Sequence, residues 1–133
     1  MKNIVSALLI CLFIVSCKKD NASSYEGNYD VEIVSVLGQK SPGTMLITEN
    51  SGNLTINVKS NVEDDEASWS FEAVDNGDDY FEVTPCALCV DDETSIKSGE
   101  VRKVDNKVSI ELQLHIDDGD GFEMDFGIEI HEK

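Results

Sequence analysis

The feature that most constrains the fold of this chain is an alternation of apolar and polar residues that recurs along most of its length. It is clearest in residues 108–116 and 122–130, where nearly every second side chain is aliphatic or aromatic. A period of two places alternate side chains on one face of a β-strand, whereas a helix has a period of 3.6. No segment after Cys17 sustains the helical period, so we expect an all-β domain. Further strands fit residues 29–33, 44–48, 54–58, 67–73, 80–84 and 95–104.

Turn residues separate the expected strands, and nearly all the links are as short as those of hairpins. Gly and Asn reach positive φ, and Asp bonds its own backbone, which suits these residues to turns. We therefore expect about eight antiparallel strands in up-and-down order, closed into a small barrel because closure removes exposed edges. A two-sheet β-sandwich is the alternative, since the links at residues 60–66 and 85–93 are long enough to cross between sheets. The turns fit residues 38–43, 50–52, 75–78, 105–106 and 117–121.

Two details of strand geometry also follow from the pattern. The apolar phase changes within residues 95–104, which predicts a bulge near Gly99. In the last hairpin, a loop centred on Gly119 pairs Leu112 with Phe126 and sets His115 opposite Glu123. The expected inward side chains are bulky and favour a filled core. They are Trp69, Phe71, Phe81, Leu112, Leu114, Phe122, Met124 and Phe126.

The first residues follow a different pattern, in which a cationic start is followed by an apolar run and then by a cysteine. The run from Ile4 to Val15 has 12 residues, too few for a transmembrane helix of ~20 residues. No small-x-small cleavage site follows it. The order ending in Ile14-Val15-Ser16-Cys17 resembles the lipobox signal peptide of bacterial lipoproteins. That resemblance implies cleavage before Cys17 and lipid attachment to Cys17.

The residues after the cysteine extend this resemblance. Lys18-Lys19-Asp20-Asn21 is similar to the export signals of surface lipoproteins in Bacteroidetes-type bacteria. We therefore expect a signal peptide at 1–16, a lipidated tether at 17–24 and a single all-β domain at 25–133. The expected location is the outer membrane, held by the N-terminal acyl chains, with the cell surface and the periplasmic leaflet both open.

A second resemblance lies at the start of the domain. Gly27-Asn28-Tyr29 opens the first expected strand and resembles the Gly-x-Trp start of lipocalin-type barrels, with Tyr29 in place of the tryptophan. In that family the aromatic ring plugs the barrel floor. The resemblance implies a small lipocalin-like domain, while a strand start with a core tyrosine accounts for the same three residues.

The charge of the chain excludes one class of partner. Loss of the single lysine in residues 1–16 leaves 9 basic residues against 27 acidic ones, a formal charge of −18. Nucleic-acid binding needs clustered Lys and Arg for phosphate contacts, so we expect none. A basic protein partner fits this charge, and we expect the protein to be a monomer.

Cys86 and Cys89 are the only cysteines after Cys17. In an exported protein this pair favours a disulfide between them. A redox role is an alternative, but it needs a helix N-terminus or a nearby cation to stabilise a thiolate, and acidic residues follow instead. Zinc binding, the third reading, would need four ligands, so we expect no metal and no cofactor.

Acidic clusters and histidines give no clear catalytic pattern. Asp118-Gly119-Asp120-Gly121 resembles part of an EF-hand loop but lacks its other ligands and helices, so solvated turns account for it better than calcium. His115 and His131 fall at outward strand positions, and no Gly-x-Ser-x-Gly elbow is present. We therefore expect a non-enzymatic binding module for a small apolar ligand or a protein partner. The alternative is a structural lipoprotein with a filled core and no pocket.

Overall fold

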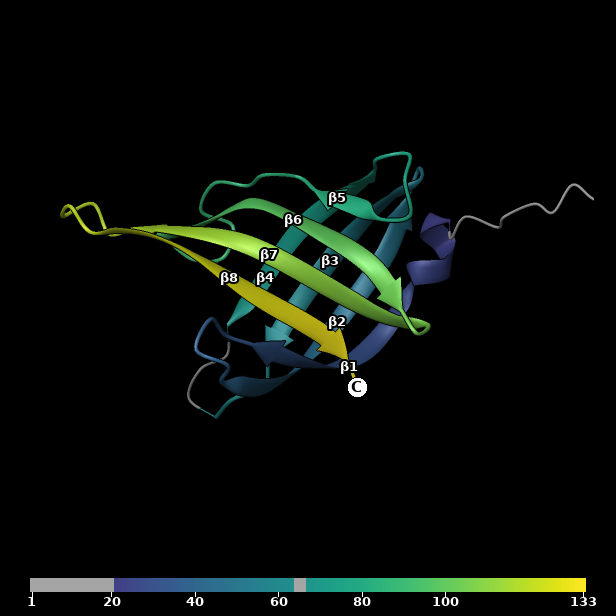
Figure 1. Ribbon diagram of the computed structural model, residues 1–133, viewed down its shortest axis with the longest axis horizontal. Coiled ribbons are helices and arrows are strands. Elements are labelled where there is room, and N and C mark those ends of the chain that lie inside the picture. Colours follow the sequence, from purple (N-terminus) through teal and green to yellow (C-terminus); the bar gives the residue numbers. More distant parts are fainter. Residues whose placement is uncertain (1–20, 64–66) are drawn as a thin grey trace, which may run out of the picture.

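The computed structural model describes residues 21–63 and 67–133, which form a closed barrel of eight antiparallel strands (Figure 1). Each strand pairs with the next in the chain, and β8 pairs with β1. The expected up-and-down barrel is therefore confirmed, and the sandwich is not formed. The elements are η1 (Ala22–Tyr25), β1 (Gly27–Val34), β2 (Lys40–Asn50), β3 (Asn53–Ser60), β4 (Ser68–Asp75), β5 (Phe81–Val83), β6 (Thr94–Val104), β7 (Lys107–Asp117) and β8 (Glu123–Glu132).

The alternation in the sequence becomes a filled interior. Along β4, Trp69, Phe71 and Ala73 are buried while the residues between them are exposed. Ile56 of β3 and Ile110 of β7 are 0 % exposed. Full burial of an aliphatic or aromatic side chain contributes about 1.5–3 kcal/mol, so this inward set is the main source of stability.

The turn after β1 is shorter than the sequence suggests. The expected turn at 38–43 is wrong at its end, because β2 begins at Lys40 and includes Pro42. The bend covers 35–39, where the Ser35 amide donates to the Gln39 carbonyl over 2.9 Å. A proline fits here because the pairing of β2 with β3 starts only at the next residue, Gly43, so the missing N–H costs no ladder hydrogen bond.

The expected irregularity in β6 is confirmed. The register with β7 shifts between Ile96 and Ser98, close to the predicted position at Gly99. A side chain at Gly99 would put its Cβ 2.5 Å from the Glu111 carbonyl oxygen and 2.7 Å from Leu112 Cδ2. Glycine is therefore required by the close approach of β7 at this bend.

The predicted register of the last hairpin is wrong by two residues. Leu112 pairs with Ile128, not with Phe126, and His115 pairs with Asp125, not with Glu123. The loop is centred one residue later because the Asp118 carboxylate accepts hydrogen bonds from the amides of Asp120 and Phe122. A shift of two residues leaves each side chain on the same face of the sheet. It carries the tip of the hairpin beyond the core, however, so Phe122 is 52 % exposed and Met124 is 42 % exposed, although both were expected to be inward.

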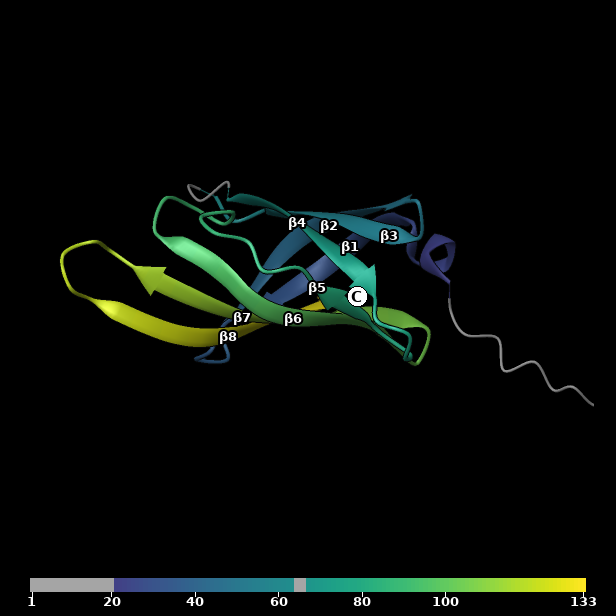
Figure 2. The same cartoon turned by 90° about the horizontal axis from the view of Figure 1, so that it is seen from above.

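The two ends of the barrel differ. Helix η1 covers one end, and the tip of the β7–β8 hairpin projects from the other (Figures 1 and 2). Tyr25 of η1 is 1 % exposed and meets the ring of Phe81 edge to face at 5.1 Å. Tyr29, for which the lipocalin resemblance implies a place on the barrel floor, is only partly buried, and its hydroxyl donates to the Tyr25 carbonyl over 2.6 Å. At this end the rings of Tyr25 and Phe81 are thus buried, whereas that of Tyr29 is not.

Helix η1 also overlaps the expected tether, at residues 22–24. Asn21 caps it by accepting a hydrogen bond from the Ser24 amide, and Ala22 is buried. The Lys103 ammonium donates to the Ser24 carbonyl over 2.7 Å and lies 4.9 Å from the centre of the Tyr25 ring. Packing on the barrel therefore begins at Ala22, three residues before the expected start of the domain.

Candidate functional site

The end of the barrel opposite η1 holds a cavity of about 280 Å³, which we call the mouth cavity. Residues of β1, β2, β4, β6, β7 and β8 contribute to its lining. Its apolar lining includes the only tryptophan of the chain. The mouth cavity is lined by Ile33, Ser35, Gln39, Ser41, Trp69, Val90, Asp91, Thr94, Leu114, Ile116, Phe126 and Ile128.

Loops at this same end of the barrel carry several exposed apolar side chains. Leu37 in the β1–β2 turn is 82 % exposed, and Leu88 in the β5–β6 link is 60 % exposed. Phe122 and Met124 add to them from the projecting hairpin. Exposed apolar residues in one region mark interaction sites on soluble proteins. Val36 and Val62 complete this group, which we call the apolar rim.

One carboxylate stands at the wall of the mouth cavity. Burial raises the pKa of Asp91, but hydrogen bonds from the Glu93 amide and from Thr94 outweigh that effect, so the pKa lies below its usual value. The Glu93 amide is 2.9 Å from Asp91 Oδ1. The wall of a mainly apolar cavity therefore carries a fixed negative charge at neutral pH.

The cysteine pair lies in the link that leads to this wall. Both cysteines are free thiols, and the Cys89 thiol lies 3.3 Å from the Cys86 carbonyl oxygen. Burial, followed by a hydrogen bond with the Cys86 side chain, raises the pKa of Cys89 to about 11. Such a thiol is a poor nucleophile at neutral pH. The disulfide between the two remains a prediction.

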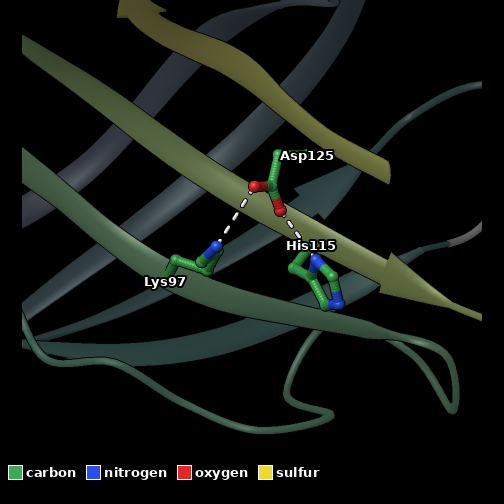
Figure 3. Close-up of polar contacts among 3 residues, drawn as sticks. All are labelled: Lys97, His115 and Asp125. Carbon is green, nitrogen blue, oxygen red and sulfur yellow. Dashed lines mark hydrogen bonds and ion pairs between the residues drawn. The ribbon is translucent and has the colours of Figure 1, made fainter. Parts of the chain in front are cut away.

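A three-residue polar cluster joins the outer faces of β6, β7 and β8 (Figure 3). Asp125 Oδ1 lies 2.6 Å from His115 Nδ1, and its other oxygen lies 3.1 Å from Lys97 Nζ. These two hydrogen bonds lower the pKa of Asp125. The cluster is exposed, and its geometry marks the observed register of the hairpin.

Hydrogen bonds also link the side chains of Ser109, His131 and Glu129, which we call the Ser109 chain. The sequence did not predict this group. Ser109 Oγ lies 3.0 Å from His131 Nδ1, and His131 Nε2 lies 2.8 Å from a Glu129 oxygen. With its proton on Nε2, the imidazole accepts from Ser109 and donates to Glu129. The predicted register paired Ser109 with Glu129 instead of His131, which hid this contact.

The Ser109 chain has the residue types of a hydrolase triad but a different setting. Ser109 is the third residue of β7, and it pairs with Arg102 on one side and His131 on the other. An acyl-transfer site needs free N–H donors where the oxyanion develops. A backbone already paired on both sides does not offer its own amide for that purpose.

The acidic loop between β7 and β8 uses its carboxylates within the turn. Asp117 Oδ1 accepts from the Gly119 amide over 2.9 Å, and Asp118 accepts from two further amides. Over residues 21–63 and 67–133, no three His, Cys, Asp or Glu side chains gather closely enough to bind a metal ion. The same residues include no helix long and apolar enough to cross a membrane. Cys17, the expected lipid attachment site, lies outside the described residues.

Comparison with known proteins gives no relative: no family model, no curated protein and no solved structure matches this chain.

Proposed function

We propose that this protein is a lipid-anchored lipoprotein of the outer membrane of a Bacteroidetes-type bacterium, and that it binds a small apolar ligand in the mouth cavity without enzymatic activity. The observation that carries the ligand proposal is the apolar cavity, with the apolar rim around it. The lipobox order ending in Cys17 supports the anchor.

The size of the cavity limits the ligand. An eight-stranded barrel is either filled by its own side chains or able to hold one small ligand. This barrel combines the two, because its lower part is filled and its open end holds about 280 Å³. A cavity of ~150 Å³ accommodates benzene, and drug-sized ligands occupy ~300–1,000 Å³. The space therefore suits one compact apolar molecule.

The polar groups of the lining indicate how such a ligand would be oriented. Ser35, Gln39 and Thr94 offer hydrogen bonds, and Asp91 offers a negative charge at the cavity wall. A few polar groups in an apolar lining fix orientation and give specificity. A ligand with an apolar body and a neutral or cationic polar group fits this lining better than an anionic one.

Trp69 makes the proposal directly testable. It is the only tryptophan and it lines the cavity, so its intrinsic fluorescence should change when N-phenyl-1-naphthylamine, a neutral apolar probe, binds. Ile116→Glu places a charge in the cavity lining and should abolish binding. Val104→Glu is the matched control, because Val104 is exposed at the opposite end, and it should leave binding unchanged.

Two further measurements complete the test. Mass spectrometry of protein purified natively from its membrane should reveal acylation of Cys17 together with any retained small molecule. Absence of probe binding to a folded protein would favour the alternative, a structural lipoprotein without a ligand. Labelling of Ser109 by a fluorophosphonate would contradict the non-enzymatic proposal.

A further inference from the structure

Strand β8 is paired along only part of one side. On the β7 side its pairing runs from Glu123 to His131, but on the β1 side it covers only Glu129 to Glu132. The cause is the turn at 35–39, where the chain leaves the barrel wall after Val34. Within the described part of the chain, no strand therefore pairs with residues 123–128 on that side. We call these six residues the free edge of β8.

Cavities lie on both faces of the sheet at the free edge. The mouth cavity is on the inner face, and a second cavity of about 260 Å³ lies on the outer face beside Val36, Gly127 and Glu129. Ser35 and Ile128 line both cavities. The two spaces thus approach each other across the gap between β8 and the end of β1, where an additional strand would lie.

The side chains of the free edge alternate in character. Met124 and Phe126 lie on the inner face, with Met124 42 % exposed and Phe126 partly buried. Glu123 and Asp125 lie on the outer face, and the end of β7 and the adjoining loop add Asp117, Asp118 and Asp120. An added strand would place alternate residues against these two faces. Its best sequence would be apolar on one face and basic on the other.

We propose that the free edge of β8 binds an extended, basic segment of a partner protein, which adds a strand to the barrel wall. An unpaired strand edge offers a row of backbone donors and acceptors for this purpose. A second copy of this chain fits poorly, because like charges directly opposed across strands are destabilising and the mature chain carries a formal charge of −18. A basic segment instead complements the charge of the hairpin.

The probe for this site is the capped heptapeptide Ac-Lys-Val-Lys-Val-Lys-Val-Lys-NH2, added to the isotope-labelled protein. We expect chemical-shift changes and slowed amide exchange within residues 123–128, because pairing of a strand edge places its free amides in hydrogen bonds. The same peptide N-methylated at every residue should bind at least about tenfold more weakly, because it cannot donate backbone hydrogen bonds. A version with Glu in place of Lys should not bind.

Protein variants locate the site. Glu123→Lys should weaken binding of the Lys-Val peptide several-fold. Glu72→Lys changes an exposed residue of β4 and should leave binding of the peptide unchanged. Equal binding of the N-methylated peptide, equal binding of the Glu peptide, or no binding at all would each overturn the proposal. Peptide binding is followed at the amides of 123–128 and ligand binding at Trp69, so the two proposals can fail separately.

Discussion

At the scale of single residues, neighbours on the barrel determine how the reactive side chains behave. The clearest case is Cys89, whose thiol is partly buried beside Cys86 and whose pKa is raised to about 11. A raised thiol pKa favours the neutral form in the folded state. Its contribution to stability is therefore complete below pH 9.0, the ordinary value, and is lost as pH rises through about 11.

The reactivity of Cys89 follows from this shift. Only the thiolate attacks an alkylating reagent, so at pH 8 the reduced, folded protein should react with iodoacetamide at Cys89 roughly a hundredfold more slowly than in urea. Mass spectrometry of a time course measures both rates, and equal rates would contradict the shift. Before reduction, the unfolded protein should contain no free thiol if the predicted Cys86–Cys89 disulfide forms, and two free thiols would refute it.

Cys17 is the residue on which the proposed location depends. Cys17→Ser removes the sulfur that would carry the diacylglycerol, so the variant should accumulate as an uncleaved, unacylated precursor. Cys11→Ser is the matched control, because Cys11 lies inside the apolar run of the signal peptide. Membrane fractionation and N-terminal mass spectrometry follow both variants, and a mature chain that starts anywhere other than residue 17 would show that the lipobox is misassigned.

At the scale of elements, η1 acts as the cover of one barrel end. Tyr25 lies between the ring of Phe81 and the Lys103 ammonium and is almost fully buried. Its contacts join the start of the chain to β5 and β6. The helix has only four residues, so its stability must come from this packing and not from its own hydrogen bonds.

Removing the Tyr25 ring should therefore destabilise the whole barrel. Truncation of a buried aromatic residue costs about 3–5 kcal/mol, and we expect Tyr25→Ala to fall in that range in urea unfolding. Tyr80→Ala is the control, since Tyr80 is only partly buried and faces Arg102 at 5.4 Å, and it should cost about 1 kcal/mol. A Tyr25→Ala cost no larger than that of the control would mean that η1 does not pack on the barrel in solution.

The β7 and β8 pair gives a test of which face is buried. Leu112 is 1 % exposed and Gln113 is exposed. Leu112→Asp buries a charge and should abolish the cooperative unfolding transition, because the cost exceeds what a domain of this size can lose. Gln113→Asp should change stability by less than about 0.5 kcal/mol. Phe126→Asp should destabilise the fold less than Leu112→Asp does, since Phe126 is only partly buried. Unfolding followed by circular dichroism can rank the stabilities of the three variants.

The elements also differ in how well the sequence predicts them. A period of two identifies strands such as β4 and β7 and assigns their inward faces correctly, because burial of one face dominates their energy. Register within a hairpin depends on side-chain hydrogen bonds in the loop, such as those of Asp118. The alternation of apolar and polar residues cannot distinguish two registers that differ by two residues. Helix η1 has only four residues, too few to show a periodic pattern. The mouth cavity and the free edge of β8 depend on where β1 leaves the closed barrel, which the pattern of a single strand does not reveal.

At the scale of the whole molecule, strong net charge opposes the apolar rim. The formal charge of −17 repels other copies of the chain, while Leu37, Phe122 and Met124 remain exposed at one end. Repulsion between copies should keep the protein monomeric at neutral pH.

This balance predicts association on acidification. As pH falls from 7 toward the isoelectric point near 4.2, carboxylates lose charge and the repulsion fades, so dynamic light scattering should detect reversible association. The double variant Leu37→Ser with Phe122→Ser should associate less at the same pH. Association of the double variant to the same extent would show that the apolar rim is not the contact surface.

The position of η1 has a consequence for how a ligand could arrive. Asn21 begins the described chain at the covered end of the barrel, and four residues span at most about 14 Å even when fully extended. If Cys17 carries acyl chains as proposed, the covered end would be held close to the bilayer and the mouth cavity would face away from it. An apolar ligand would then have to cross water to reach the cavity, so its source would be a carrier or another cell and not the membrane that holds the protein.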